Sequence, residues 1–404
     1  MKCNWKEYSV QELIELGMLE EPMDGNHGSI HPKSSDYVKS GVPFIMANNL
    51  SNGIVDYTNC AYISQQQANT LRKGFAHPGD VLLTHKATIG RTAIVDDRYD
   101  TIILTPQVTY YRVKNGISNR YLKYYFDTST FQQTLANWAG SGSTRAYLGI
   151  TAQRKLPIVL PPLEQQVRIA DILTAFDDKI TLNTAINNNL EQQAKAIFLN
   201  EFLTLETLPD GWKQASLIDI ADYLNGLAMQ KYRPTADETG IPVLKIKELR
   251  QGCCDDNSEL CSPSIKSEYI IHDGDVIFSW SGSLLVDFWC GGICGLNQHL
   301  FKVTSNKYNK WFYYAWTKHH LDRFIAVAAD KATTMGHIKR DELSKAEVLI
   351  PNEADYKRIE TLLQPIYDLI IANRIENKKL AETRDTLLPK LMTGEIDISE
   401  VDYE

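Results

Sequence analysis

One long stripe of apolar positions occurs twice in this chain. In residues 163–200, apolar and asparagine positions recur at alternating spacings of four and three, the heptad pattern of a coiled coil. Adding 190 to each position reaches a second stripe with two asparagines at the same heights. The first stripe contains Ile169, Leu173, Phe176, Ile180, Asn183, Asn187, Leu190, Ala194 and Ile197, and the second contains Ile359, Leu363, Ile366, Ile370, Asn373, Asn377, Leu380, Arg384 and Leu387. The pattern predicts two long, similar helices.

Each stripe needs a partner, and the simplest partner is the other stripe. In an antiparallel pair, residues whose numbers sum to a constant face each other, and a sum of 560 brings Asn183 to Asn377 and Asn187 to Asn373. Because a buried asparagine prefers another asparagine across an apolar seam, these four residues are expected to determine the register. Either helix would be roughly 50 Å long. The alternative, two unrelated surface helices packed on separate domains, leaves the shared asparagine layers unexplained.

The segments between the stripes are also duplicated. Residues 77–84 (HPGDVLLT) match residues 272–279 (HDGDVIFS), in both cases a turn feeding an apolar strand. Asp80 and Asp275 are expected to bind backbone N–H groups of these turns and not to act as catalytic acids. Gln107 and Gln298 are expected to open a second matched strand. The chain therefore has the order module, helix, module, helix, with an α+β fold and an internal pseudo-two-fold repeat.

Length and composition agree with this organisation. The chain has 404 residues, enough for two or three domains with cores of their own. It has no apolar run of about 18 residues, so no membrane span is expected, and its first residues lack an apolar signal region, so a cytoplasmic location is expected. The seven cysteines have no regular spacing, which predicts reduced thiols and no metal site.

The charge is unevenly distributed. The net charge of −8 argues against a nucleic-acid partner, but residues 60–160 carry 12 Lys or Arg against 5 Asp or Glu. Residues 298–340 carry 8 against 2, whereas the segment from 341 onward carries 15 acids against 8 bases. A solvated charged face is the usual cause of such runs, but two basic islands at matching places in a repeat favour a polyanionic partner.

Motifs of catalysis are missing from the sequence. It contains no phosphate-binding loop of the Gly-x-x-x-x-Gly-Lys type, no glycine-rich dinucleotide turn, no Asn-Pro-Pro-Tyr or Asp-Pro-Pro-Phe, no His-Glu-x-x-His and no Gly-x-Ser-x-Gly. Two basic modules joined by a helical rod suit positioning better than catalysis.

The sequence resembles the specificity subunits of type I restriction–modification systems over nearly its whole length. The resemblance depends on the doubled layout, on residues 160–166 (LPPLEQQ) entering the first helix and on residues 387–395 (LLPKLMTGE) ending the second. The second helix departs from the family by beginning with residues 351–355 (PNEAD), without the Glu-Gln pair.

The resemblance implies a division into five segments and a set of partners. Residues 1–158 and 203–348 would be target-recognition domains, residues 159–202 and 349–392 spacer helices in an antiparallel coiled coil, and residues 393–404 a tail. Each domain would read one half of a split site in double-stranded DNA. Two methyltransferase subunits would dock on the helices, and a restriction–translocase subunit can join. This chain would bind no cofactor, with S-adenosylmethionine, ATP and Mg²⁺ bound by the partners.

The residues expected to contact DNA lie in loops. Cationic members would hold phosphates, and hydroxyl members could read bases. The candidates are Lys86, Thr88, Arg91, Ser141, Thr144 and Arg145 in the first module, and Ser279, Ser281, Lys331, Thr333, Thr334 and His337 in the second. Two other classes of function stay open: a coiled-coil scaffold that bridges protein partners without reading DNA, and an enzyme with an unrecognised site.

Overall fold

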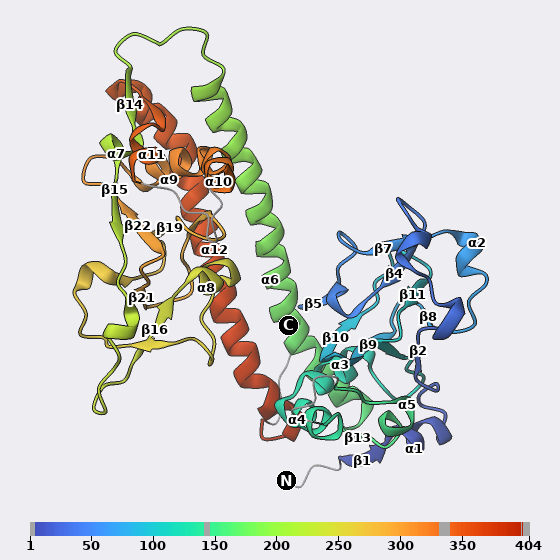
Figure 1. Cartoon of the computed structure of the whole chain (residues 1–404). Coiled ribbons are helices and arrows are strands. Elements are labelled where there is room, and N and C mark those ends of the chain that lie inside the picture. Colours follow the sequence, from blue (N-terminus) through green and yellow to red (C-terminus); the bar gives the residue numbers. More distant parts are fainter. Residues whose placement is uncertain (1–4, 141–145, 331–339, 397, 399–404) are drawn as a thin grey trace. The chain divides into compact units, whose positions relative to one another are not determined.

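The computed structural model describes residues 5–140, 146–330, 340–396 and 398 (Figure 1). The chain divides into two compact units. Unit 1 comprises Met1–Asp178 and Glu382–Glu404, and unit 2 comprises Lys179–Ala381. Each unit contains one mixed α/β module and a segment of each long helix.

The module of unit 1 contains two main sheets. One has the strand order β2-β12-β9-β10-β6-β5 and the other the order β3-β7-β4-β11-β8. The strands are β2 (Met23–Asp24), β3 (Tyr37–Val38), β4 (Val42–Ile45), β5 (Leu50–Ser51), β6 (Gly53–Val55), β7 (Ala61–Ile63), β8 (Phe75–Ala76), β9 (Val81–Lys86), β10 (Thr88–Ile94), β11 (Ile102–Leu104) and β12 (Val108–Tyr111).

The module of unit 2 repeats this topology with fewer strands. Its sheets have the orders β15-β22-β19-β20 and β17-β16-β21-β18, which match β2-β12-β9-β10 and β7-β4-β11-β8 of unit 1 strand for strand. The strands are β15 (Asp222–Asn225), β16 (Ile241–Leu244), β17 (Leu260–Cys261), β18 (Ile270–Ile271), β19 (Val276–Ser279), β20 (Leu285–Phe288), β21 (Cys294–Leu296) and β22 (Leu300–Thr304). Unit 1 adds β3, β5 and β6, so the duplication is one of topology and not of loop length.

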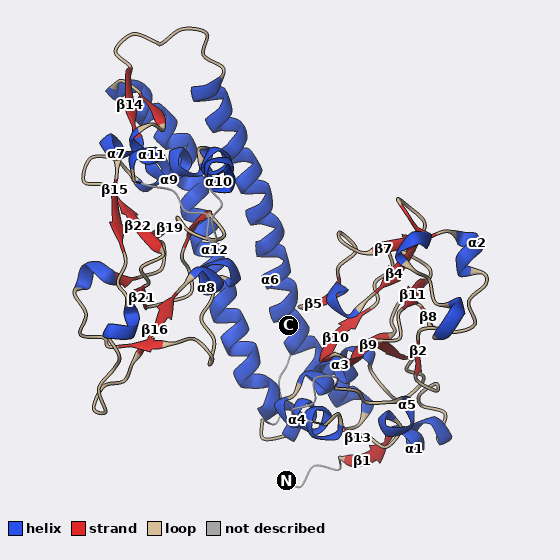
Figure 2. Ribbon diagram, viewed as in Figure 1, coloured by secondary structure: helices blue, strands red, loops and turns tan. Residues whose placement is uncertain are grey.

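Helices and a two-stranded sheet complete each module (Figure 2). The small sheets pair β1 (Lys6–Ser9) with β13 (Pro157–Leu160), and β14 (Lys213–Ser216) with β23 (Glu347–Ile350). The helices of unit 1 are α1 (Val10–Glu15), α2 (Gln65–Ala68), α3 (Asn119–Asp127), α4 (Ser129–Trp138) and α5 (Ile150–Gln153); those of unit 2 are α7 (Leu217–Ile220), α8 (Ile246–Gln251), α9 (Lys310–His319), α10 (Leu321–Asp330) and α11 (Asp341–Ser344). The aromatic residues of α3 and α9 are core residues, because Tyr121, Phe126, Trp311 and Tyr314 are almost fully buried.

Local hydrogen bonds explain why both repeats fold alike. The carboxylate of Asp80 accepts a hydrogen bond from the backbone N–H of His77 at 2.8 Å, and Asp275 accepts one from His272 at 2.9 Å. The expectation that both aspartates serve their turns is confirmed. Matched strands, β12 and β22, follow Gln107 and Gln298 as predicted. The alignment of the two glutamines is off by one position, because the Gln107 carbonyl accepts the N–H of His85 where the His299 carbonyl accepts the N–H of Trp280. The two glutamines were aligned by residue type, whereas the hydrogen-bond register of the strands aligns Gln107 with His299.

The two predicted stripes are the long helices α6 (Leu163–Phe198) and α12 (Glu353–Thr393). They run antiparallel within each unit, and stripe residues such as Leu173 in unit 1 and Ile359, Leu363 and Ile370 in unit 2 are almost fully buried. Helix α6 begins at Leu163, after strand β13, and a π-helical turn (Leu199–Leu203) follows it. The predicted α+β fold with a repeated module and an antiparallel coiled coil is confirmed.

The four asparagines form two facing polar layers in unit 2. Asn183 Nδ2 donates to Asn377 Oδ1 at 2.9 Å, and Asn373 Nδ2 donates to Asn187 Oδ1 at 2.9 Å. Asn187 also donates to the carbonyl of Ile370 at 3.2 Å. These are the pairs that a sum of 560 brings together. That they determine the register stays a prediction.

Each long helix is attached at its start to its own module. In unit 1 the indole Nε1 of Trp5 donates to Gln165 at 3.1 Å, and Gln166 accepts the backbone N–H of Ser118 at 3.0 Å. In unit 2 the indole of Trp212 donates to Asp355 at 2.9 Å, and the hydroxyl of Tyr356 accepts the N–H of Asn309 at 2.9 Å. Asp355 and Tyr356 thus attach the second helix to its module where Gln165 and Gln166 attach the first, with a carboxylate and a phenol in place of two amides.

No helix in the described part of the chain combines the length and apolarity that crossing a bilayer requires.

Candidate nucleic-acid interface

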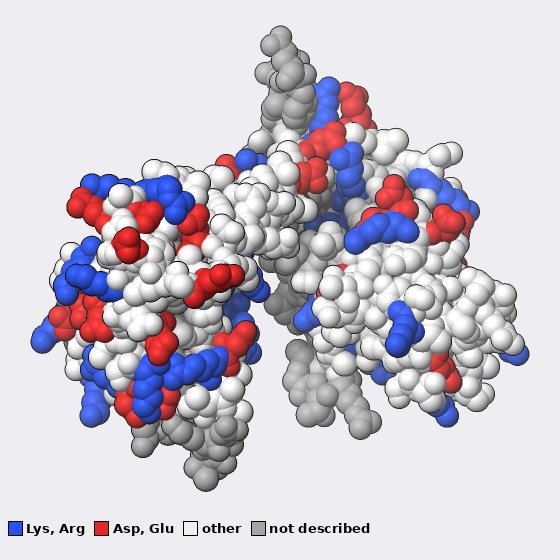
Figure 3. Space-filling model, turned by 90° about the horizontal axis from the view of Figure 1, so that it is seen from above, with Lys and Arg blue, Asp and Glu red and all other residues white. Residues whose placement is uncertain are grey.

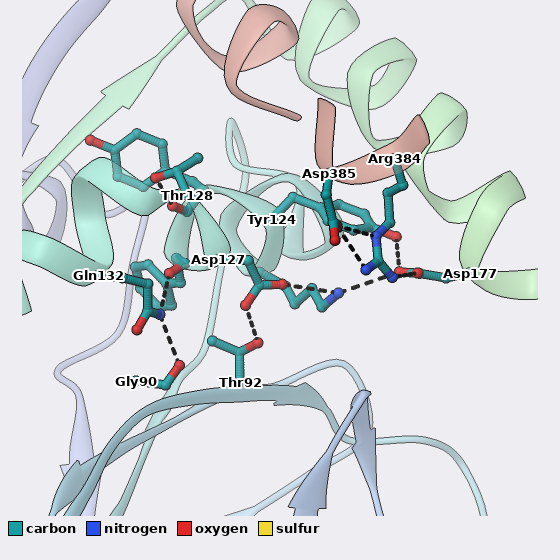
Figure 4. Close-up of polar contacts among 12 residues, drawn as sticks. Gly90, Thr92, Tyr124, Asp127, Thr128, Gln132, Asp177, Arg384 and Asp385 are labelled. Atoms are coloured by element: carbon teal, nitrogen blue, oxygen red, sulfur yellow. Dashed lines mark hydrogen bonds and ion pairs between the residues drawn. The ribbon is translucent and has the colours of Figure 1, made fainter. Parts of the chain in front are cut away.

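A polar network in unit 1 connects the larger sheet to both long helices (Figure 4). Thr92 on β10 donates its hydroxyl to Asp127 at the end of α3, with an O–O distance of 2.5 Å. The ammonium of Lys123 lies 3.1 Å from Asp127 and 3.4 Å from Asp177 on α6. The side chain of Lys123 is only 9% exposed, so both carboxylates stabilise a cation that is largely removed from water.

Asp177 is the centre of this network. It accepts a hydrogen bond from the hydroxyl of Tyr124 at 2.6 Å and forms an ion pair with Arg384 on α12. Burial opposes ionisation of the Asp177 carboxyl, but Lys123, Tyr124 and Arg384 together outweigh it and hold the pKa of Asp177 below its ordinary value. The network therefore carries paired charges from the sheet through α3 to both helices.

Unit 2 has its own network at the same kind of junction. Arg374 on α12 forms ion pairs with Asp287 on β20 at 2.7 Å and with Glu191 on α6 at 2.9 Å. Lys318 on α9 lies 3.6 Å from Glu191. Arg374 thus connects α12 to both β20 and α6.

The two junctions differ at one pair of repeat-related positions. Tyr124 and Asp177 of unit 1 correspond, at the same offset of 190, to Tyr314 and Tyr367 of unit 2. Tyr314 and Tyr367 pack edge to face, with ring centroids 5.1 Å apart. The hydrogen bond between Tyr124 and Asp177 in one repeat is therefore replaced by aromatic packing in the other, and both contacts require the helix to keep its register against the module.

The described candidates for DNA contact in unit 1 surround the hairpin between β9 and β10. Lys86 and Thr88 are exposed on either side of Ala87, whose backbone is left-handed with φ of 65°. The Lys86 ammonium lies 5.9 Å from the ring centroid of Tyr147, an aromatic that is 49% exposed. Arg91 is exposed but donates to the carbonyls of Ala47 and Leu50 at 3.4 Å, so part of its guanidinium is occupied by the short 3-10 helix (Ala47–Asn49) and the start of β5. Lys86 and Thr88 present their side chains more freely.

The described candidates in unit 2 are Ser279, the last residue of β19, and Ser281 in the turn that follows. Ser279 is fully buried, and its hydroxyl donates to the carbonyls of Ser281 and Ser283 at 3.2 and 2.9 Å. This geometry gives Ser279 a structural role in the turn. The Ser281 hydroxyl lies 3.1 Å from Nδ1 of His299.

The other seven candidates lie outside the described residues. They come from the two polar stretches of sequence at residues 140–145 and 331–337. These residues are Ser141, Thr144, Arg145, Lys331, Thr333, Thr334 and His337.

Sequence reasoning missed a pocket beside Lys86. The pocket has a volume of about 360 Å³ and is lined by His27, Gly28, His31, Tyr37, Met46, Lys86, Thr105, Pro106 and Gln107. Two of its polar atoms, Thr105 Oγ1 and His31 Nδ1, are buried without a hydrogen-bond partner among the described residues. The signal in the sequence is Thr-Pro-Gln between two apolar strands, since proline there marks a turn and not a continuous strand.

Charge on the surface is mixed. Figure 3 shows Lys and Arg side chains interspersed with Asp and Glu on the face that it displays.

Burial raises the pKa of Cys290 to about 11, so this thiol stays protonated at neutral pH. Among the described residues, no cluster of three or more His, Cys, Asp or Glu side chains could hold a metal ion.

Comparison with known proteins identifies the class to which this fold and its paired helices belong. The family model of the type I restriction modification DNA specificity domain matches residues 3–192 and 209–382, one match for each repeat. The chain therefore belongs to the type I restriction–modification DNA specificity family. Members of this family have the specificity role in their systems and not the catalytic one.

Individual relatives match nearly the full length of the chain. The MjaIX specificity subunit of Methanocaldococcus jannaschii is 27% identical over 98% of this chain and 95% of the relative. The EcoKI specificity subunit of Escherichia coli K12 is 23% identical over 89% of this chain and 84% of the relative. The crystal structure of a type I S subunit from M. genitalium has a TM-score of 0.60 at 12% identity and covers 96% of both chains, which shows a shared fold.

Proposed function

We propose that this chain reads a split site in double-stranded DNA and positions two methyltransferase subunits on it. Each module reads one half of the site, and a restriction–translocase subunit joins the assembly when DNA is cut. The chain does this work in the cytoplasm, where the DNA of the cell lies.

One observation supports this proposal most strongly. Two modules that share a strand order are each attached to the helix pair by polar contacts. In unit 1 Tyr124 on α3 donates to Asp177 on α6, and in unit 2 Asp287 on β20 forms an ion pair with Arg374 on α12. A protein that reads two short sequences at a fixed separation needs two readers and a rigid connection between them. Readers on one face of a duplex are spaced by about 34 Å or a multiple of it, which is within the reach of helices roughly 50 Å long.

The chemistry of modification belongs to the partners under this proposal. S-adenosylmethionine would be bound by the methyltransferase subunits, and ATP and Mg²⁺ by the restriction–translocase subunit. Docking of the methyltransferases on the helix pair would leave the modules free to contact DNA.

The test is to co-express the chain with the type I methyltransferase whose gene lies next to its own. The host should have no DNA methyltransferases. Sequencing of modified bases should then yield a motif of two short half-sites separated by a fixed number of unspecified bases. Purified complex should bind DNA with that motif in a salt-sensitive way, whereas a protein scaffold would assemble with its partners and show no motif. An equal affinity for all DNA sequences would contradict the proposal.

A further inference from the structure

We infer that the pocket beside Lys86 in unit 1 is a nucleobase-reading site, in which Thr105 and Gln107 discriminate one base of the first half-site. This inference rests on the proposed function, because it assigns a ligand to a part of the DNA-reading module.

The pocket is built from five separate segments of the module. Thr105 and Gln107 belong to the turn between β11 and β12, Tyr37 belongs to β3, and Lys86 ends β9. His31 follows a short 3-10 helix (Gly28–Ile30). Because sheet strands hold these segments, the pocket is formed before any ligand arrives. A volume of about 360 Å³ lies at the small end of the range for ligand sites, which suits a single base.

Thr105 is the strongest sign that a ligand belongs here. The residue is only 6% exposed, and its hydroxyl is buried without a hydrogen-bond partner among the described residues, although Thr105 is one of the residues that line the pocket. A buried hydroxyl without a partner is destabilising, and valine would fill the same space without that penalty. A ligand that hydrogen-bonds the hydroxyl explains why threonine occupies this position.

The lining chemistry favours a base over a phosphate. The ring of Tyr37 and the side chain of Met46 offer apolar surface, while Thr105, Gln107 and His31 offer donors and acceptors for the edge of a base. Lys86 is the one Lys or Arg among the lining residues, and a phosphate site usually gathers more than one cation or several backbone N–H groups.

The neighbouring carboxylate does not oppose an electron-rich ligand. Asp24 is 2% exposed and is paired with Lys73 and with His27, whose Nε2 lies 2.8 Å from its carboxylate. Burial works against ionisation of Asp24, but Lys73 and His27 outweigh it and hold its pKa below the ordinary value. The charge of Asp24 is therefore balanced within the protein.

The equivalent place in unit 2 has different chemistry. Backbone hydrogen bonds identify the correspondence: Thr105 N–H donates to Ile45 as Asn297 N–H donates to Leu244. Gln107 then corresponds to His299, which contacts Ser281. Two readers with one fold but different groups at the same turn suit two different half-sites.

The experiment uses the complex of this chain with its methyltransferase partner and compares Thr105→Val, Gln107→Ala and the control Gln133→Ala. Gln133 is an exposed glutamine on α4 that contacts Asn137 and does not line the pocket. The methylated motif of each complex is determined by sequencing modified bases, and melting temperatures are measured in parallel. Both pocket variants should lose discrimination at one position of one half-site by roughly 5- to 100-fold, the worth of a good base contact. The control should keep the motif.

Thr105→Val separates recognition from folding. The variant should melt at or above the temperature of the unchanged chain, because the hydroxyl has no partner to lose. A lower melting temperature, or an unchanged motif in both pocket variants, would overturn the inference. Equal weakening on all sequences would assign the pocket to a phosphate and also overturn it. An unchanged chain that yields no motif at all would overturn the proposed function itself.

The same complex can distinguish two ways of presenting the base. 2-Aminopurine placed at the relaxed position should brighten on binding if the base leaves the stack and enters the pocket. Constant fluorescence together with the relaxed motif would mean that the base is read by its edge within the duplex. Both results support the pocket as a base reader.

Discussion

Asp177 on α6 and Arg384 on α12 are 207 positions apart in the sequence and form an ion pair within unit 1. The same Asp177 carboxylate accepts a hydrogen bond from the hydroxyl of Tyr124, which belongs to the module of unit 1. One carboxylate therefore joins the module to both long helices. Because its partners come from three elements, it constrains where α12 lies along α6 as well as how the module is attached.

Replacing Asp177 by asparagine should destabilise the chain by about 1–3 kcal/mol, because Arg384 and Lys123 would lose a common counter-charge in a mostly buried site. Chemical denaturation followed by tryptophan fluorescence measures the change. Asp178→Asn is the matched control: Asp178 is an exposed neighbour, and its substitution should stay within about 0.5 kcal/mol. Equal effects of the two substitutions would contradict the assigned role.

The pH dependence of stability should reflect the same carboxylate. Since the pKa of Asp177 is lower in the folded chain than in the unfolded chain, its contribution is present above the ordinary carboxyl pKa of about 3.9 and is lost as pH falls through the folded value. Unfolding free energies measured from pH 6 down to pH 2 should therefore fall more steeply below about pH 4 for the unchanged chain than for Asp177→Asn. Parallel curves would show that the ion pair adds nothing to stability.

The asparagine layers lead to a prediction about register. A single Asn187→Leu substitution removes the acceptor of Asn373 and should cost about 1–3 kcal/mol. Replacing all four asparagines by leucine should restore or raise stability but permit other registers, since leucine tolerates any apolar neighbour. The spacing of the methylated half-sites and the oligomeric state should then become heterogeneous. A single unchanged spacing would show that the asparagines do not determine the register.

Lys86 provides a prediction about DNA affinity. In the complex with its methyltransferase partner, Lys86→Ala should weaken binding to all sequences and reduce the slope of log K against log salt concentration by about 1, as expected for one lost phosphate contact. Binding titrations at several salt concentrations measure the slope. Lys6→Ala on β1 is the control, because Lys6 is an exposed lysine that does not line the pocket, and it should leave the slope unchanged. An unchanged slope for Lys86→Ala would show that Lys86 does not contact a phosphate.

Several features of the fold could be predicted because they depend on local pattern. The heptad stripe, the paired asparagines and the turn aspartates Asp80 and Asp275 are each visible within short stretches of sequence. The repeat strengthens every such inference, because a pattern found twice at nearly constant spacing requires one structural explanation. The family resemblance agreed with that architecture, and the family model matches both repeats.

The candidate site was less accessible to sequence reasoning. Lys86 and Thr88 lie at an exposed hairpin, as predicted. Ser279, in contrast, is fully buried, and its hydroxyl donates a hydrogen bond to the Ser283 carbonyl in the following turn. The exposure of a serine depends on the strands packed around it and not on its neighbours in sequence. The match of Gln107 with Gln298 failed for a related reason, since hydrogen-bond register and not residue type decides which residues correspond.

The sequence by itself determined the duplicated order of module and helix and the antiparallel pairing of the stripes, because periodicity and matching polar layers are properties of the linear chain. Only the tertiary structure decided which side chains from distant segments meet. It brought Asp177 to Arg384 and gathered His31, Lys86 and Thr105 around one pocket. Contacts of this kind depend on how strands and helices pack in three dimensions, and no spacing along a single element specifies them.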